Sequence, residues 1–75
     1  MINKLKEILI STTDVKKDIQ IDENTVILRD LGLNSLELIE VVCTVEDEFE
    51  ISIADKKIRS IVTIGDLIKM IESQQ

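Results

Sequence analysis

The segment from Asn34 to Glu50, NSLELIEVVCTVEDEFE, restricts the fold of this chain more than any other. Its apolar residues recur with the 3.6-residue period of an α-helix, so they form one stripe that must be buried against other helices. Asn34 is a good N-cap, and Glu37 three residues later completes the pattern of a capping box. We therefore expect a helix that begins just after Asn34. The apolar stripe consists of Leu38, Val41, Val42, Val45 and Phe49.

Two other segments show the same periodicity, one near each end of the sequence. The first runs from about Ile2 to about Thr13. The second begins after Thr63, a predicted N-cap with Asp66 at the box position. A short helix of one or two turns is expected at about residues 55–59, before this last helix. The periodic positions are Ile2, Leu5, Ile8 and Leu9 in the first helix, and Ile64, Leu67, Ile68 and Ile71 in the last.

Residues 14–33 lack helical periodicity and contain clusters of polar side chains. An irregular loop of this length is unusual in a compact domain, so it needs apolar anchors. We expect an ordered loop whose own apolar side chains pin it to the helices. These side chains are Val15, Ile19, Ile21, Val26, Leu28 and Leu31.

The β-branched runs TVIL, FEISI and SIVTI would also suit short strands. However, no two-residue hairpin turn links them, proline is absent, and glycine occurs only at positions 32 and 65. We therefore predict an all-α fold for residues 1–75 as a single domain. The expected architecture is a small four-helix bundle with three main helices, a short third helix and a long ordered loop between the first and second helices.

The charge of the chain argues against two classes of partner. With 9 basic and 15 acidic residues, its net charge is −6. Nucleic-acid backbones and anionic lipid surfaces repel such a chain, whereas basic patches on partner proteins complement it. The acidic character is concentrated, because residues 30–55 contain eight carboxylates and no lysine or arginine. We expect protein partners, with no nucleic acid and no membrane.

Cys43 is the single cysteine, so no internal disulfide can form. The sequence shows no spacing typical of metal ligands, so we expect no metal site. No stretch is apolar and long enough to span a bilayer, and the N-terminus lacks the pattern of a signal peptide. A cytoplasmic location follows as the expectation.

One face of the central helix combines apolar and acidic side chains away from the core stripe. Leu36 and Cys43, seven residues apart, lie there beside Glu40 and Asp47. Two interpretations stay open. The face can be a solvated acidic surface with scattered apolar residues, which are common on proteins. It can also be a docking strip, in which a central apolar contact is flanked by charges that steer a partner.

Ser35 is the candidate functional hydroxyl in this helix. A catalytic serine needs a base and an oxyanion site, and the chain has no histidine or other identifiable activating group. We therefore do not expect an enzyme. The first turn of a helix favours an anion, so a phosphate ester on this oxygen would be stabilised. Taken alone, however, the sequence NSLE is more typical of simple helix capping than of a modification site.

The larger segment DLGLNSLELIEVVCTVEDEFEISI resembles the signature region of the acyl carrier proteins. The usual form of that signature is Asp-Leu-Gly-x-Asp-Ser-Leu, followed by an acidic helix that ends in Glu-x-Phe. The resemblance extends over essentially all 75 residues, including the first helix, the long loop and the IVTIGDLIKMI segment.

The resemblance implies that Ser35, flanked by Asn34 and Leu36, bears a 4′-phosphopantetheine arm. A separate phosphopantetheinyl transferase installs this arm from coenzyme A, and the thiol of the arm carries acyl groups as thioesters. The resemblance also implies that the second helix is presented to basic docking patches on acyl-transferring, condensing and modifying enzymes. We expect the carrier to be a monomer. The residues at those contact positions are Leu36, Glu37, Glu40, Cys43 and Asp47.

Three features depart from the family pattern. Asn34 replaces the customary aspartate before the serine, and Ala54 stands where many members have proline. The segment with Lys56, Lys57 and Arg59 is basic where common housekeeping members are acidic. Together these departures suggest a specialised carrier that serves a dedicated pathway.

The expected function is that of a discrete acyl carrier for fatty-acid or polyketide-type biosynthesis. Two alternatives remain open. One is an aminoacyl or peptidyl carrier of nonribosomal assembly, which would have the same arm and a different cargo. The other is an unmodified acidic interaction module. The sequence LGLNS, with no Gly-Gly pair before the serine, favours acyl cargo over aminoacyl cargo.

Overall fold

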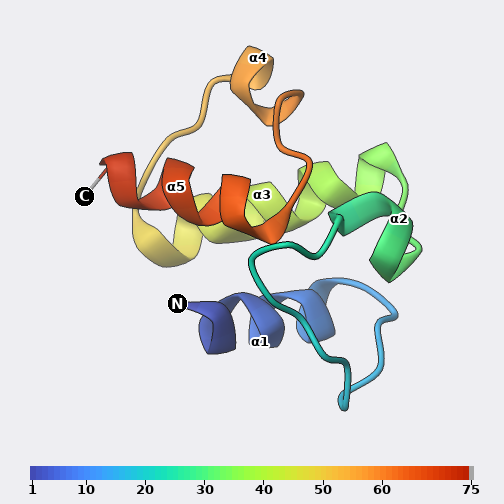
Figure 1. Cartoon of the computed structure of the whole chain (residues 1–75). Helices are drawn as coiled ribbons and strands as arrows, with labels where there is room; N and C mark the ends of the chain where they lie inside the picture. Colours follow the sequence, from blue (N-terminus) through green and yellow to red (C-terminus); the bar gives the residue numbers. More distant parts are fainter. Residues whose placement is uncertain (75) are drawn as a thin grey trace.

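The computed structural model describes residues 1–74, and this part of the chain is helical (Figure 1). In these residues the β-structure is limited to one isolated bridge between Val26 and Thr63. The prediction of an all-α fold is confirmed. The helices are α1 (Ile2–Thr12), α2 (Ile27–Leu31), α3 (Ser35–Phe49), α4 (Asp55–Ile58) and α5 (Ile64–Gln74).

The central helix α3 begins where its capping pattern predicts. The side chain of Asn34 accepts a hydrogen bond from the Glu37 N–H at 2.8 Å, and Glu37 in turn accepts from the Asn34 N–H at 3.1 Å. The capping box is therefore complete. The helix ends before Glu50, which adopts a left-handed conformation with φ 55°.

The short helix α2 lies inside the segment predicted to be an ordered loop. It is held at its start by the Asp30 carboxylate, which accepts a hydrogen bond from the Val26 N–H at 2.8 Å. It stops at Gly32, whose φ of 67° few other residues adopt readily. Ile27 is its single buried residue. A helix this short has too few apolar positions to show a period, which is why the sequence pattern did not indicate it.

The end of the long loop is attached to the start of α5 by backbone hydrogen bonds. The Ile27 N–H donates to Val62 at 2.9 Å, the Ile64 N–H donates to Thr25 at 3.0 Å, and the Gly65 N–H donates to Glu23 at 2.9 Å. This close approach requires glycine at position 65, since a Cβ atom there would lie 2.9 Å from the Glu23 carbonyl oxygen.

The cap predicted for the last helix is also present. The Asp66 N–H donates to the Thr63 hydroxyl at 3.1 Å. The Asp66 carboxylate accepts from the N–H groups of Thr63 and Val62, each at 3.0 Å. These backbone donors hold the pKa of Asp66 below its usual value, because they stabilise the charged carboxylate.

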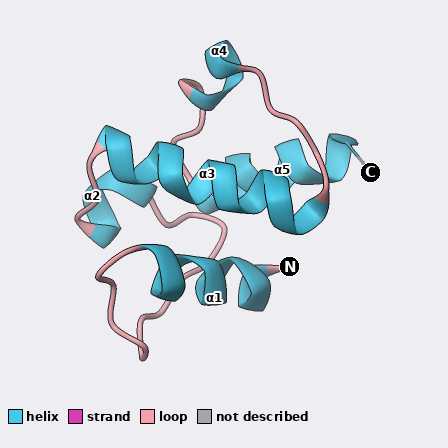
Figure 2. Cartoon of the chain, turned by 180° about the vertical axis from the view of Figure 1, so that it is seen from behind, coloured by secondary structure: helices cyan, strands magenta, loops and turns pink. Residues whose placement is uncertain are grey.

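The core is aliphatic and lies between α3 and the helices around it. Both views of the chain place α3 between α1 on one side and α4 on the other, with α5 alongside (Figures 1 and 2). The predicted stripe is buried except for Phe49, which is half-buried at the end of α3. The buried residues are Leu5, Ile8, Leu9, Ile27, Leu33, Leu38, Val41, Val42, Val45, Ile53, Ile58, Ile61, Ile64, Leu67, Ile68 and Ile71.

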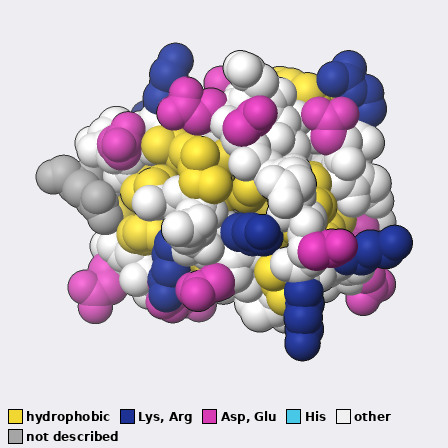
Figure 3. Space-filling view, turned by 60° about the horizontal axis from the view of Figure 1, so that its bottom comes forward, with side chains coloured by type: hydrophobic (Ala, Val, Ile, Leu, Met, Phe, Trp, Pro, Cys, Tyr) yellow, Lys and Arg dark blue, Asp and Glu magenta, His cyan; other side chains and the backbone are white. Residues whose placement is uncertain are grey.

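Charges of both signs cover the α1 side of the molecule. Figure 3 shows acidic and basic side chains interspersed among small apolar areas when this side is turned forward. An ion pair between Lys4 and Glu48 connects α1 with α3. The hydrogen bond from Lys4 to Glu48 raises the pKa of the lysine. Within residues 1–74, no helix has the length and apolar character needed to cross a membrane.

Candidate functional site

Ser35 is the first residue of α3, and its side chain is exposed. Asn34 caps the helix in its place, so the serine hydroxyl is not needed for capping. Within residues 1–74, no backbone or side-chain group forms a hydrogen bond with that hydroxyl. The neighbouring Leu36 side chain is 65% exposed. The hydroxyl is therefore accessible to a modifying enzyme.

The start of α3 provides a favourable electrostatic environment for an anion. The Glu37 N–H donates a hydrogen bond to the Asn34 side chain, and the Leu38 N–H donates to the Asn34 backbone carbonyl. The N–H groups of Ser35 and Leu36 have no partner inside the helix, because the first turn lacks preceding carbonyl groups. These two donors and the positive end of the helix dipole would stabilise a phosphodiester on the Ser35 oxygen. The site thus fits the phosphate end of a phosphopantetheine group.

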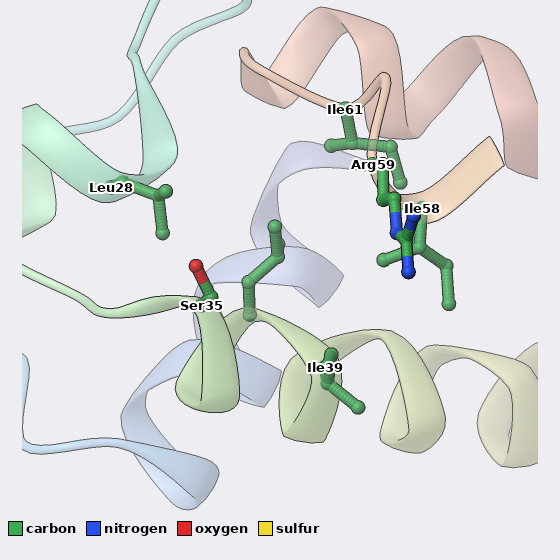
Figure 4. A pocket seen from close by; sticks show the side chains of 7 residues that line it. Leu28, Ser35, Ile39, Ile58, Arg59 and Ile61 are labelled. Atoms are coloured by element: carbon green, nitrogen blue, oxygen red, sulfur yellow. The ribbon is translucent and has the colours of Figure 1, made fainter. Parts of the chain in front are cut away.

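A pocket of about 300 Å³ opens beside Ser35. Figure 4 shows Ser35 and Leu28 on one side of it, Ile58, Arg59 and Ile61 on the other, and Ile39 on the α3 surface. The lining is therefore contributed by α2, α3 and the α4 region. Apart from Ser35 and Arg59, every lining residue is aliphatic: Leu28, Leu38, Ile39, Ile58 and Ile61.

The outward face of α3 contains the positions predicted for partner contact. Leu36, Glu40, Cys43 and Asp47 are exposed, as their helical spacing predicts. Glu37 is half-buried, because its carboxylate returns to the backbone of the N-cap. Among residues 1–74, neither Glu40 nor Asp47 forms an ion pair. Both carboxylates are thus available to cationic groups of another protein.

Ser35 was predicted as a site residue, but the pocket beside it was not predicted from the sequence. Ile39 is 45% exposed and lies one helical turn after Ser35, so this spacing from the serine was a usable signal. Arg59 and Ile58 belong to a segment far from Ser35 in the sequence, and only the fold brings them to the site. Within residues 1–74, no cluster of acidic or cysteine side chains could hold a metal ion.

Comparison with known proteins decides the family. The sequence model of a family described as "Phosphopantetheine attachment site" matches residues 3–71. An acyl carrier protein of Lactobacillus acidophilus is 38% identical over 97% of this chain and 90% of its own length. The chain belongs to the acyl carrier protein family. An acyl carrier protein of a Sulfurovum species is 34% identical over 97% of this chain and 96% of its own length.

Solved structures of acyl carrier proteins have the same fold. The crystal structure of an acyl carrier protein from Thermotoga maritima superimposes with a TM-score of 0.87 at 30% identity, covering 97% of this chain and 84% of that one. An acyl carrier protein from Enterococcus faecalis, described as having high thermal stability, gives a TM-score of 0.76 at 30% identity. That match covers 96% of this chain and 90% of the other. The small helical bundle is therefore the fold of the family.

Membership in the family establishes the general role of the chain. Acyl carrier proteins are carriers and not catalysts, so the chain is not an enzyme. Their prosthetic group is a covalently attached 4′-phosphopantetheine. Their partners are a phosphopantetheinyl transferase and the enzymes of biosynthesis. The identification as a phosphopantetheine carrier, first suggested by the DLGLNSLE segment, is confirmed.

Proposed function

We propose that this carrier bears its prosthetic group on Ser35 and shuttles acyl thioesters between enzymes of fatty-acid or polyketide-type biosynthesis. The observation that carries the proposal is the exposed hydroxyl at the first position of α3, left without a hydrogen bond within residues 1–74. The family requires one modifiable serine, and this serine combines exposure with a helix end that favours phosphate. Asn34 and Leu36 flank the attachment point.

The residues of the chain have separate tasks in this function. The Ser35 oxygen forms the phosphodiester, and the free N–H groups of the first turn of α3 stabilise its charge. When attached, the arm supplies a thiol that holds cargo as a thioester. Since the chain lacks histidine, the attachment chemistry must come from the transferase. Tethering raises the effective concentration of cargo at a partner enzyme without tight binding.

We further propose that the outward face of α3 is the docking surface for these enzymes. Its contacts would be Leu36 and Cys43 in the centre, with Glu37, Glu40 and Asp47 directed towards a basic patch. Interactions between exposed charges are individually weak and rapidly reversible, as a shuttle requires. A monomer suits this function, because all of these contacts come from a single helix.

A dedicated pathway, rather than bulk fatty-acid synthesis alone, is favoured by the charge of α4 and its C-cap. Lys56, Lys57 and Arg59 are all exposed, so their charge is presented to partners. Charge reversal at these positions should lower turnover by the specific partner enzymes. Unchanged turnover would remove the support for specialisation and leave the carrier function intact. Loading with acyl and aminoacyl groups would then identify the cargo.

The attachment site is tested by mass spectrometry of the intact protein. The purified chain is incubated with coenzyme A, magnesium and a broad-range phosphopantetheinyl transferase. We expect the gain of one phosphopantetheine group, which Ser35→Ala abolishes. Ser52→Ala is the matched control, because Ser52 is also exposed and should leave the gain unchanged. Lack of gain with several active transferases would favour the unmodified interaction module instead.

The docking face is tested with the same transferase. Glu40→Lys combined with Asp47→Lys should raise the KM for the carrier severalfold and leave kcat nearly unchanged, because the charges assist encounter and not chemistry. Glu72→Lys combined with Asp18→Lys is the control, since both are exposed acids outside α3 and the pair makes the same change in net charge. An equal effect of the control would show that net charge, and not this face, determines recognition.

A further inference from the structure

The pocket beside Ser35 has an unusual distribution of charge. Five of its seven lining residues are aliphatic, and Arg59 is its one ionisable residue. Figure 4 shows Arg59 on the side opposite Ser35, next to Ile58 and near Ile61. A group that starts at the Ser35 side and crosses the pocket therefore meets aliphatic surface first and a cation afterwards.

The Arg59 guanidinium is available for a ligand. Within residues 1–74, it forms no ion pair with any carboxylate. Asp55 lies one turn earlier in the α4 segment and lines a second cavity together with Arg59, yet no ion pair joins the two side chains. Arg59 is exposed, so it keeps its hydration in the empty pocket. A guanidinium binds carboxylate oxygens through two parallel hydrogen bonds, which alkyl groups cannot form.

We propose that Arg59 makes this pocket selective for acyl cargo that has an aliphatic chain and a carboxylate at its far end. The aliphatic lining would bury the methylene groups, and Arg59 would bind the terminal carboxylate. A methyl-terminated chain would gain the same burial but would remove water from the guanidinium without replacing its hydrogen bonds. The proposal rests on attachment of the arm at Ser35, and it adds the chemical class of the cargo.

The arm itself also contains an anion, its phosphodiester, but the geometry favours the cargo. The phosphate is bonded directly to the Ser35 oxygen, where the first turn of α3 already supplies donors. Arg59 lies across the pocket from that oxygen (Figure 4). The pantetheine segment between the phosphate and the thioester is uncharged, so a second anion on the attached group can come only from the cargo.

The test compares two acyl groups of the same length, hexanoyl and adipoyl, of which only adipoyl ends in a carboxylate. The transferase loads each one from its coenzyme A thioester onto the full chain, and intact mass confirms loading. The readout is the rate of thioester cleavage by hydroxylamine, normalised to the same acyl group on free pantetheine. We expect adipoyl to be protected at least about tenfold more than hexanoyl, since a hydrogen bond to a charged group contributes a factor of about ten or more.

Two variants assign this preference to Arg59. Arg59→Gln should give equal protection of the two groups, whereas Lys56→Gln, which removes a neighbouring charge outside the pocket lining, should retain the difference. Equal protection in the unsubstituted chain, or an unchanged difference in Arg59→Gln, would overturn the proposal. A shift of the phosphorus resonance caused by Arg59→Gln in the cargo-free carrier would also overturn it, by assigning Arg59 to the phosphodiester. Failure to load either group would instead refute attachment at Ser35.

Discussion

Gly65 and Gly32 provide a paired test of how this structure uses its two glycines. Gly65 lies in the first turn of α5, where alanine would ordinarily stabilise a helix by up to about 1 kcal/mol. Here the added Cβ would lie 2.9 Å from the carbonyl oxygen of Glu23, which is a backbone atom and cannot rotate away. The Gly65 N–H also donates to that oxygen at 2.9 Å, so a displacement would weaken this hydrogen bond.

The expected magnitude follows from these opposing contributions. Relieving the contact costs about 1–3 kcal/mol, as overpacking does elsewhere. A weakened hydrogen bond costs about 1 kcal/mol more, and the helix preference of alanine offsets up to about 1 kcal/mol. We therefore expect Gly65→Ala to lower the free energy of unfolding by about 1–3 kcal/mol. For a chain of this size, the corresponding decrease in Tm is about 4–8 °C for each kcal/mol.

Gly32→Ala is the companion variant, and it isolates a different cause. A Cβ at this position has no atom within 4 Å, so the effect comes from the φ of 67° alone. The expected loss is about 1 kcal/mol. Both variants are measured by urea unfolding followed by far-ultraviolet circular dichroism, which reports the loss of helix. A neutral or stabilising Gly65→Ala would refute the proposed contact between α5 and the loop.

Three further predictions concern the ends of helices. Asn34→Ala should lower the free energy of unfolding by about 1 kcal/mol in urea unfolding, and Asn34→Asp, which preserves the cap, should not. Glu50→Gly should raise the Tm, because it removes the left-handed strain of a residue with φ 55°; an unchanged or lower Tm would contradict this account. Since hydrogen bonds from Thr63 and Val62 lower the pKa of Asp66, its contribution to stability is present above the unfolded pKa and is lost as the pH falls through the folded one. Asp66→Asn should therefore weaken the loss of stability in acid, as measured by Tm between about pH 5 and pH 2, and an identical acid profile would disprove this role.

The extent to which sequence predicted this fold depended on the length of each element. The capping residues and apolar stripe of α3 lie within one continuous segment, so its start at Ser35 could be predicted. The same holds for α5, where Thr63 and Asp66 form the expected cap. In α2, by contrast, Ile27 is the single buried residue, and its helix depends on the Asp30 cap and on tertiary contacts.

The candidate site divides in the same way. The location of Ser35 in a first helical turn and the exposure of the α3 face follow from local periodicity. The pocket does not, because Leu28 and Arg59 reach it from segments before and after α3. No local pattern specifies how α2 and the α4 region approach each other across Ser35. The basic character of the α4 region was visible in the sequence, but its position beside the pocket was not.

The hydrogen bonds between the loop and the start of α5 have a consequence for the order of events during biosynthesis. Thr25 and Ile27, which precede the pocket residue Leu28, obtain their backbone partners from Ile64 and Val62. During translation, Val62 and Ile64 leave the ribosome well after Ser35. One wall beside the serine is thus completed by later-synthesised sequence, so a transferase that senses this wall would discriminate chains that contain α5 from shorter nascent chains.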